Sequence, residues 1–216
     1  AIEEGVVAVD GRPVTQQGVV LNPEVQSVSV RGNPVERDAL VHFMLNKPSG
    51  VLCTSSDPQG RKTVHDLLPD PPARIYTVGR LDKDSEGLIL ITNDGEFAHV
   101  MMHPRHHVRK TYRVWINEPI RSIDRRTLLS GVEDQGEVLR AASVGSSRGR
   151  AVYEVVLNEG RNRQIHRMFE GVNRKVVRLQ RIAIGSLRLG RLSRGGIRPL
   201  LVTERRSLFR EARGHP

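Results

Sequence analysis

The chain has 216 residues, with 34 lysines and arginines against 24 aspartates and glutamates, and a formal net charge of +10 at pH 7. This length suffices for one well-packed core with or without a small additional module. The basic excess favours a polyanionic partner such as a nucleic acid, and a merely solvated basic face is the alternative. Cys53 is the only cysteine, which excludes a disulfide framework and suits a reducing compartment. No apolar stretch approaches the roughly 20 residues that cross a bilayer, so we expect a soluble protein.

The first 35 residues have the features of a small separate module. Ile2–Gly5 is expected to be the last turn of a helix that ends at glycine. Asp10-Gly11 between apolar residues predicts a β-hairpin, and the alternation in Val25–Val30 predicts a half-buried strand. A linker is expected over residues 36–40.

The larger domain is expected to begin with a strand at Val41–Leu45. A further strand, Arg74–Val78, leads into a polar loop that carries Asp82 and Asp84, and Leu88–Ile91 follows as four consecutive apolar residues. Such a short apolar run, bounded by glycine and by a turn signal, predicts a strand buried on both faces. A carboxylate next to so rigid a strand can be aimed at a substrate, although from the residues alone both aspartates could simply cap backbone amides.

Periodicity predicts helix and strand in the next segment. Glu96–His103 has the apolar spacing of a short amphipathic helix, and the three histidines after it lack the spacing of a metal site. Lys110–Ile116 alternates as a strand that turns Tyr112 toward its apolar side. From its position alone, Tyr112 is as well explained as an ordinary core tyrosine.

The second half of the chain contains three further patterns. Predicted strands and helices occupy Ile120–Leu129 (helix), Val138–Ser143, Ala151–Leu157 and Val176–Leu189 (strands), with a flexible loop at Gly145–Gly149. Ile165, Met168, Phe169 and Val172 have the spacing of a buried helix face, which places Arg163 and Arg167 together on another face. Two arginines one helical turn apart can hold phosphate or a carboxylate. Residues 204–216 are charged and are expected to be a frayed basic tail.

Several blocks match one known family in that family's order. They are Leu45-Asn46-Lys47-Pro48-Ser49-Gly50, Gly79-Arg80-Leu81-Asp82, Ser85-Glu86-Gly87-Leu88, Thr92-Asn93-Asp94-Gly95, Lys110-Thr111-Tyr112 and Glu159-Gly160-Arg161-Asn162-Arg163-Gln164-Ile165. Together they extend over roughly residues 42–200, and the chain resembles the RsuA/RluB-type pseudouridine synthases.

The resemblance implies an α+β fold of two parts. Residues 41–203 are expected to form the catalytic domain, a mostly antiparallel mixed sheet with flanking helices and a central cleft. Residues 1–35 resemble the C-terminal part of the small RNA-binding module that precedes this domain in the family. The two helices that open that module have no counterpart in the sequence, through truncation or loss.

The resemblance also implies an activity and its residues. The expected reaction is the isomerisation of uridine to pseudouridine in ribosomal RNA, without cofactor or metal. Asp82 is expected to act as nucleophile or base, and Tyr112 to stack on the uracil. Arg80 is expected to occupy the vacated position or to support the flipped nucleotide. The residues expected to bind substrate or RNA are Arg80, Lys110, Arg161, Arg163, Gln164, His166 and Arg167.

His166 departs from the family pattern. Arginine or lysine usually follows the Gln-Ile pair in these enzymes and forms an ion pair with the catalytic aspartate, whereas this chain has His166. Histidine can replace that cation only while it is protonated, and its unperturbed pKa is about 6.5. Arg163 or Arg167 could take its place.

Three alternatives accompany this interpretation. The block Gly160–Gln164 favours large-subunit over small-subunit ribosomal RNA as substrate. The chain could instead be a catalytically silent RNA-binding protein, or a hydrolase that uses the same carboxylate to release free uracil. We expect a monomer in the cytoplasm that acts on ribosomal RNA or an assembly intermediate and has no membrane partner.

Overall fold

The structure, a computed structural model, describes residues 1–22, 25–36, 38–69 and 74–214. The chain divides into two compact units, Ala1–Ala39 and Leu40–Pro216. The division falls within the expected linker, of which residue 37 lies outside the described residues, as do the last two residues of the expected tail. No helix in the described part of the chain is long and apolar enough to span a membrane.

The first unit contains a four-stranded antiparallel sheet in the order β2-β1-β3-β4. Its strands are β1 (Val7–Val9), β2 (Arg12–Pro13), β3 (Val28–Val30) and β4 (Asn33–Pro34). The hairpin turn has positive φ at both Asp10 and Gly11, the geometry for which an Asp-Gly pair is favoured. The predicted hairpin is therefore confirmed. The expected helical end, Ile2–Gly5, is a single turn that closes at Gly5.

The second unit is built on a nine-stranded mixed sheet. Seven strands follow one another in the order β11-β12-β8-β13-β7-β5-β15, while β14 pairs with β13 and β6 with β7. The strands are β5 (His42–Lys47), β6 (Tyr76–Val78), β7 (Glu86–Thr92), β8 (Lys110–Ile116), β11 (Ser143–Ser146), β12 (Val152–Leu157), β13 (Val176–Ile184), β14 (Leu187–Arg188) and β15 (Ile197–Pro199). The β7–β13 pairing is parallel and the other strand pairings of this sheet are antiparallel. The predicted α+β architecture is confirmed.

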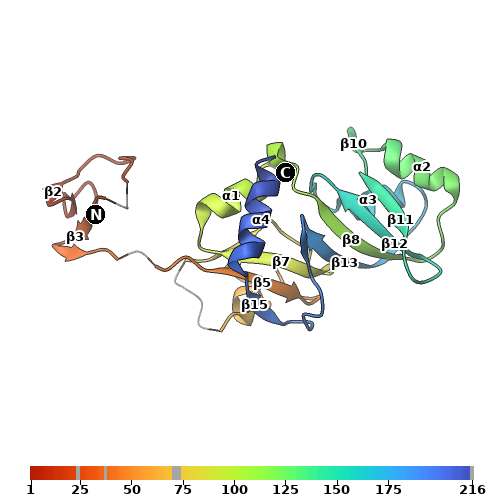
Figure 1. Cartoon of the computed structure of the whole chain (residues 1–216), viewed down its shortest axis with the longest axis horizontal. Helices are drawn as coiled ribbons and strands as arrows, with labels where there is room; N and C mark the ends of the chain where they lie inside the picture. The colour runs from red at the N-terminus through yellow and green to blue at the C-terminus, as the bar shows by residue number, and fades with distance from the viewer. Residues whose placement is uncertain (23–24, 37, 70–73, 215–216) are drawn as a thin grey trace. The chain divides into compact units, whose positions relative to one another are not determined.

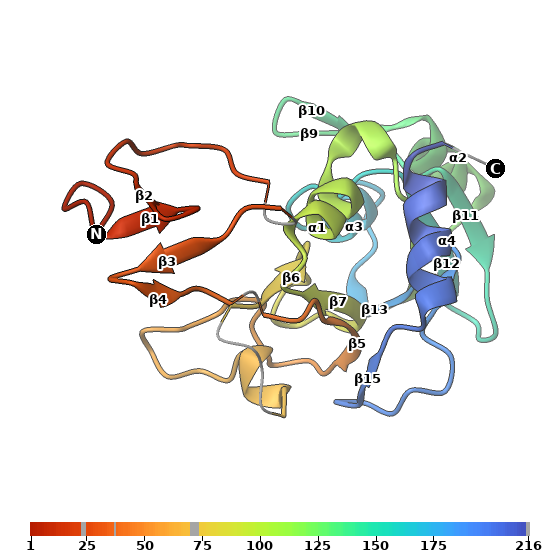
Figure 2. The same ribbon diagram turned by 60° about the vertical axis from the view of Figure 1, so that its left-hand side comes forward.

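Helices cover the sheet because β7 is apolar on both faces. Leu88 and Leu90 pack with α1 (Gly95–Met102) and α4 (Val202–Ala212), which lie side by side in Figures 1 and 2. Ile89 and Ile91 pack into a second core with residues of α2 (Ser122–Ser130) and α3 (Gln164–Glu170). The remaining elements are the short helices η1 (His65–Leu67) and η2 (Pro104–His106) and the hairpin of β9 (Val132–Asp134) and β10 (Glu137–Leu139). Burial of alternate side chains on opposite faces fixes the position of the loop before β7.

Three secondary-structure predictions were wrong. The expected strand Val138–Ser143 is split between β10 and β11, and the expected loop Gly145–Gly149 begins inside β11. The expected frayed tail is helical through Ala212, with Leu208 fully buried between the sheet and α1. This segment is an amphipathic helix whose exposed face carries the charged residues. Near its start, Glu204 accepts hydrogen bonds of 2.7 Å from Arg198.

Truncation of Leu208 tests whether α4 packs on the domain. Leu208→Ala is expected to lower the free energy of unfolding by about 2–5 kcal/mol, because it leaves a cavity beneath α4. Urea denaturation measures the effect, and Arg206→Ala on the exposed face of the same helix is the matched control. Equal stability of both variants would mean that α4 does not pack on the domain.

Candidate active site

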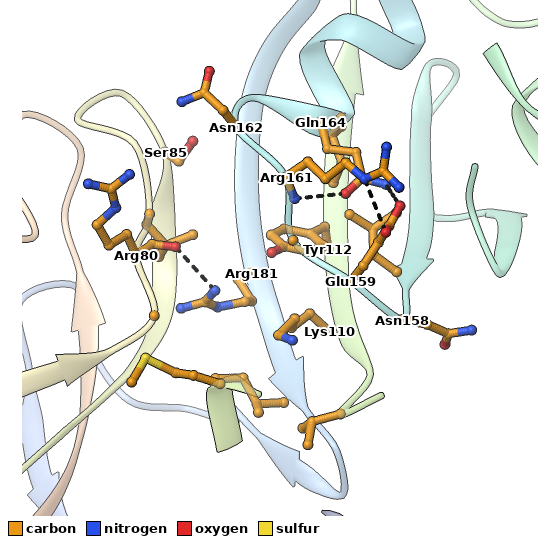
Figure 3. Close-up of a pocket in the computed structure, with 18 of the residues that line it drawn as sticks. Arg80, Ser85, Lys110, Tyr112, Asn158, Glu159, Arg161, Asn162, Gln164 and Arg181 are labelled. Atoms are coloured by element: carbon orange, nitrogen blue, oxygen red, sulfur yellow. Dashed lines mark hydrogen bonds and ion pairs between the residues drawn. The ribbon is translucent and has the colours of Figure 1, made fainter. Parts of the chain in front are cut away.

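A pocket of about 510 Å³ opens beside the point where β13 meets β7. Its volume is typical of a small-molecule site. Its walls come from the loop before β7, the end of α1 with η2, β8, the segment before α3, and β13 (Figure 3). Eight of the nine residues predicted from the sequence line it: Arg80, Asp82, Lys110, Tyr112, Arg161, Arg163, Gln164 and His166. Segments far apart in the sequence are thus brought to one cavity.

The Asp82 loop is held at both ends. The Leu81 side chain is buried, and its amide donates a hydrogen bond of 3.4 Å to Cys53 Sγ. The buried Ser85 donates its amide to the Asp82 carbonyl over 3.1 Å. These anchors leave the Asp82 carboxylate, one-third exposed, at the rim of the pocket.

Lys47 supports the same loop from behind. It is fully buried, and its Nζ donates to the carbonyls of Val51 at 2.7 Å, Pro48 at 3.0 Å and Lys83 at 3.4 Å. The Gly50 amide also donates to the Lys83 carbonyl, over 2.7 Å. Burial lowers the pKa of Lys47. The turn after β5 therefore fastens the carboxylate loop to the sheet.

Arg163 is the cation next to the two aspartates. Its Nη1 lies 3.9 Å from Asp82 Oδ2 and 3.6 Å from Asp84 Oδ2. His166 Nε2 lies 4.0 Å from Asp84 Oδ2, and burial followed by the Arg163 charge lowers the pKa of His166 below 6.5. Both effects favour the neutral form of the His166 ring. Among the described residues, Arg163 is the one basic side chain within 4.0 Å of the Asp82 carboxylate.

Tyr112 and two cations form the floor of the pocket. Tyr112 is 8% exposed, and Arg181, 3% exposed, lies directly opposite it across the β8–β13 pair. Lys110 precedes Tyr112 by two residues and therefore shares its face of the strand. Burial, followed by the Arg181 charge, lowers the pKa of Lys110 to about 8. Arg181 was not among the residues predicted from the sequence, although a charged residue within a predicted strand was a usable signal.

A hydrogen-bonded wall faces this floor. Glu159 accepts from Arg161 Nε at 3.1 Å and from Gln164 Nε2 at 3.1 Å, and the Gln164 Oε1 atom accepts the Arg161 amide at 3.1 Å (Figure 3). The two predicted substrate-binding residues thus bind each other directly and through Glu159, which was not predicted as a site residue. These bonds fix the direction of the chain into α3.

Comparison with known proteins identifies the family. The chain matches the RNA pseudouridylate synthase family over residues 41–171. The chain belongs to that family. It is 38% identical to ribosomal large subunit pseudouridine synthase B of Bacillus subtilis, over 92% of this chain and 83% of that protein. It is 36% identical to ribosomal small subunit pseudouridine synthase A of Yersinia pestis, over 92% and 85%. A crystal structure of a pseudouridylate synthase, 30% identical, superposes with a TM-score of 0.74 over 96% of this chain and 90% of that one.

Arg167 has a different place in this pseudouridylate synthase from the one expected. Its guanidinium pairs with Asp134, and with Glu137 at 2.8 Å, on the β9–β10 hairpin outside the pocket. Arg163 and Arg167 do not share a site, because Arg163 precedes α3 in a left-handed conformation and is directed away from the helix face. Arg167 is therefore excluded as the partner of Asp82.

The division of roles between Arg163 and His166 predicts unequal effects of mutation. Arg163→Met is expected to lower the pseudouridine synthase rate at pH 7 by about tenfold, because it removes the cation beside Asp82. His166→Gln is expected to change the rate by less than about twofold, because a neutral ring is replaced by a neutral amide. Single-turnover kinetics on one RNA measures both variants. A larger loss in His166→Gln than in Arg163→Met would contradict the assignment.

The lowered pKa of Lys110 predicts an alkaline gain in stability. The unfolded chain holds this proton up to about pH 10.5 whereas the folded enzyme releases it near pH 8, so between these values the unfolded state binds more protons and stability rises with pH. The free energy of unfolding of the parent, minus that of Lys110→Met, should therefore increase from pH 8 to 10.5. Urea titrations across this range measure the difference. A constant difference would show that Lys110 is not desolvated.

Proposed function

We propose that this enzyme converts uridine to pseudouridine in ribosomal RNA, with Asp82 as the catalytic carboxylate and Tyr112 against the uracil. The observation that carries the proposal is that Asp82 and Tyr112, far apart in the sequence, line one pocket of a pseudouridylate synthase. Two relatives that are named as ribosomal RNA enzymes support the choice of RNA.

The chemistry requires a carboxylate at the sugar and a confined base. The bond between C1′ and N1 must break, the uracil must turn and C1′ must join C5. The proton on C5 must then leave, and N1 must gain one. No electrons are exchanged with an external group, so the reaction balances without a cofactor. Asp82 either attacks C1′ or removes the proton from C2′, and the loop that holds it is fixed at Leu81, Ser85 and Lys47 for either role.

Because Tyr112 lies deep in the pocket, the uridine must leave the RNA helix to reach it. Tyr112 is nearly buried, and a stacked base cannot reach it, so the nucleotide must be flipped at a cost of about a few kcal/mol. Arg80, exposed at the rim, is suited to support the vacated position or the flipped nucleotide. Arg161 and Arg163, also exposed, are suited to phosphate contacts.

Large-subunit RNA is the preferred substrate within this proposal. The block Gly160–Gln164 favours it, and small-subunit RNA is the alternative because the two named relatives are almost equally similar to this chain. We further propose that the unit Ala1–Ala39 contributes to RNA binding, and that the enzyme acts as a monomer in the cytoplasm.

The test uses unmodified large- and small-subunit RNA carrying tritium at uracil C5. Tritium release with pseudouridine mapped in large-subunit RNA is the expected result. Pseudouridine in small-subunit RNA alone would favour the second substrate. Free uracil as product would indicate a hydrolase, and binding without release from naked RNA and ribosomal precursors would indicate a silent RNA-binding protein.

A further inference from the structure

The pocket floor holds positive charge with no anion of the protein to balance it. Arg181 Nε donates to the Leu88 carbonyl at 2.7 Å and Nη1 to the Arg80 carbonyl at 3.5 Å, whereas Nη2 is buried without a partner. Among the described residues, neither Arg181 nor Lys110 has a carboxylate within ion-pair distance. A buried guanidinium with a free N–H is costly unless a ligand completes its hydrogen bonds.

The backbone around Arg181 fixes the direction of its side chain. The ladder between β13 and β8 shifts register between Arg181 and Ala183, and such bulges redirect side chains beside functional sites. On the other side, β7 approaches so closely that a Cβ at Gly87 would lie 2.3 Å from the Arg181 carbonyl oxygen. In Figure 3, Arg181 lies between the Arg80 loop and the Lys110–Tyr112 strand. The guanidinium is held in the pocket by two strands.

We propose that Arg181, assisted by Lys110, binds the uracil as an anion while it is detached from the sugar. This inference rests on the proposed function and adds to it a group that stabilises the detached base. The Arg181 Nη2 hydrogen donates to a uracil carbonyl oxygen, and the Lys110 ammonium adds a second positive charge nearby.

The electron balance of the reaction places a negative charge on the detached uracil. When C1′–N1 breaks, the bonding pair stays on N1 and spreads to the oxygens at C2 and C4. Asp82 supplies the replacement bond at C1′ in the covalent route, or takes the C2′ proton in the elimination route. In both routes the free uracil carries one negative charge until C5 bonds to C1′. A preorganised cation at that position lowers the barrier to C1′–N1 cleavage, because negative charge develops on the base in that step.

The depth of the site favours the base over a phosphate as its ligand. Arg181 is 3% exposed and lies opposite Tyr112, where a flat base can enter edge-on. A bridging phosphate has a sugar on each side and meets the exposed arginines of the rim first. The floor thus differs from the rim in the anion that it can accept.

The first experiment measures binding without catalysis. At neutral pH 5-nitrouracil is an anion and uracil is neutral, and both have the same ring. The parent enzyme is expected to bind 5-nitrouracil at least about tenfold more tightly than uracil, and Arg181→Gln should reduce this ratio below about threefold. Lys110→Met should reduce it as well, which provides a second variant if Arg181→Gln does not fold. Arg188→Gln, exposed on β14, removes the same charge and should keep the ratio.

The second experiment measures the reaction. Fluorine at C5 makes uracil a better leaving group. The factor by which Arg181→Gln lowers the rate should therefore be at least about fivefold smaller with 5-fluorouridine RNA than with uridine RNA. Loss of the starting nucleoside measures the rate on both RNAs. Equal losses on both substrates, or an unchanged 5-nitrouracil ratio in folded Arg181→Gln, would overturn the inference. Displacement of 5-nitrouracil by inorganic phosphate at equal concentration would overturn it in favour of a phosphate site.

The two proposals fail in different ways. If the parent isomerises no RNA but Arg181→Gln abolishes the preference for 5-nitrouracil, the anion site stands and the proposed function falls. If isomerisation is established but the preference does not depend on Arg181, only the anion site falls. Asp82→Asn is expected to lose turnover and still bind 5-nitrouracil more tightly than uracil, because Arg181 and Lys110 remain in place.

Discussion

Asp82→Asn is expected to lower the rate of uridine isomerisation by at least about 1,000-fold. Asparagine is nearly the same size but neither attacks C1′ nor takes a proton, so the chemical step loses its essential group. The loop should keep its shape, because Leu81, Ser85 and Lys47 hold it through contacts that do not use the Asp82 carboxylate. Tritium release under single-turnover conditions measures the loss.

Asp84→Asn is the matched control for this variant. Asp84 carries the same group two residues away and has the same neighbour, Arg163. Its side chain is 60% exposed and does not line the pocket, so we expect the rate to change by less than about threefold. Loss of activity in Asp84→Asn with retention in Asp82→Asn would reverse the assignment.

Gly87→Ala is expected to lower the free energy of unfolding by about 2–5 kcal/mol. Gly87 has a φ of +104°, and an added methyl group would lie 2.3 Å from the Arg181 carbonyl oxygen. The β7–β13 pairing, which is limited to two residues of each strand, must therefore open. Because Arg181 belongs to that pairing, activity should fall further than stability alone explains. Urea denaturation and tritium release well below the midpoint measure the two effects.

Gly190→Ala separates backbone strain from this close contact. Gly190 has a φ of +61° and open space around it, so the substitution should cost only about 1 kcal/mol and leave activity intact. Equal destabilisation by both substitutions would show that β7 and β13 are not tightly joined at Gly87.

The sequence by itself determined the elements and most of the site. A short apolar run between glycine and a turn signal predicted the fully buried β7. Period-2 and helical spacing predicted the position of Tyr112 and the buried face of α3, because these patterns depend only on which side of an element faces the core. The resemblance to the family predicted eight residues that line the pocket. The amphipathic α4 was not predicted, because the segment was interpreted from its charged composition. The helical spacing of Leu208 and Ala212 among those charges was not considered.

The tertiary structure decided which charges meet. Arg163 and Arg167 are four residues apart, yet the left-handed residue before α3 directs one to Asp82 and leaves the other with Asp134. Burial and the Arg163 charge lower the pKa of His166, and no local sequence pattern contains these surroundings. Arg181 enters the pocket through a bulge and a close approach at Gly87. Ion pairing, burial and pKa depend on distances between strands and loops that are remote in the chain, and only packing fixes those distances.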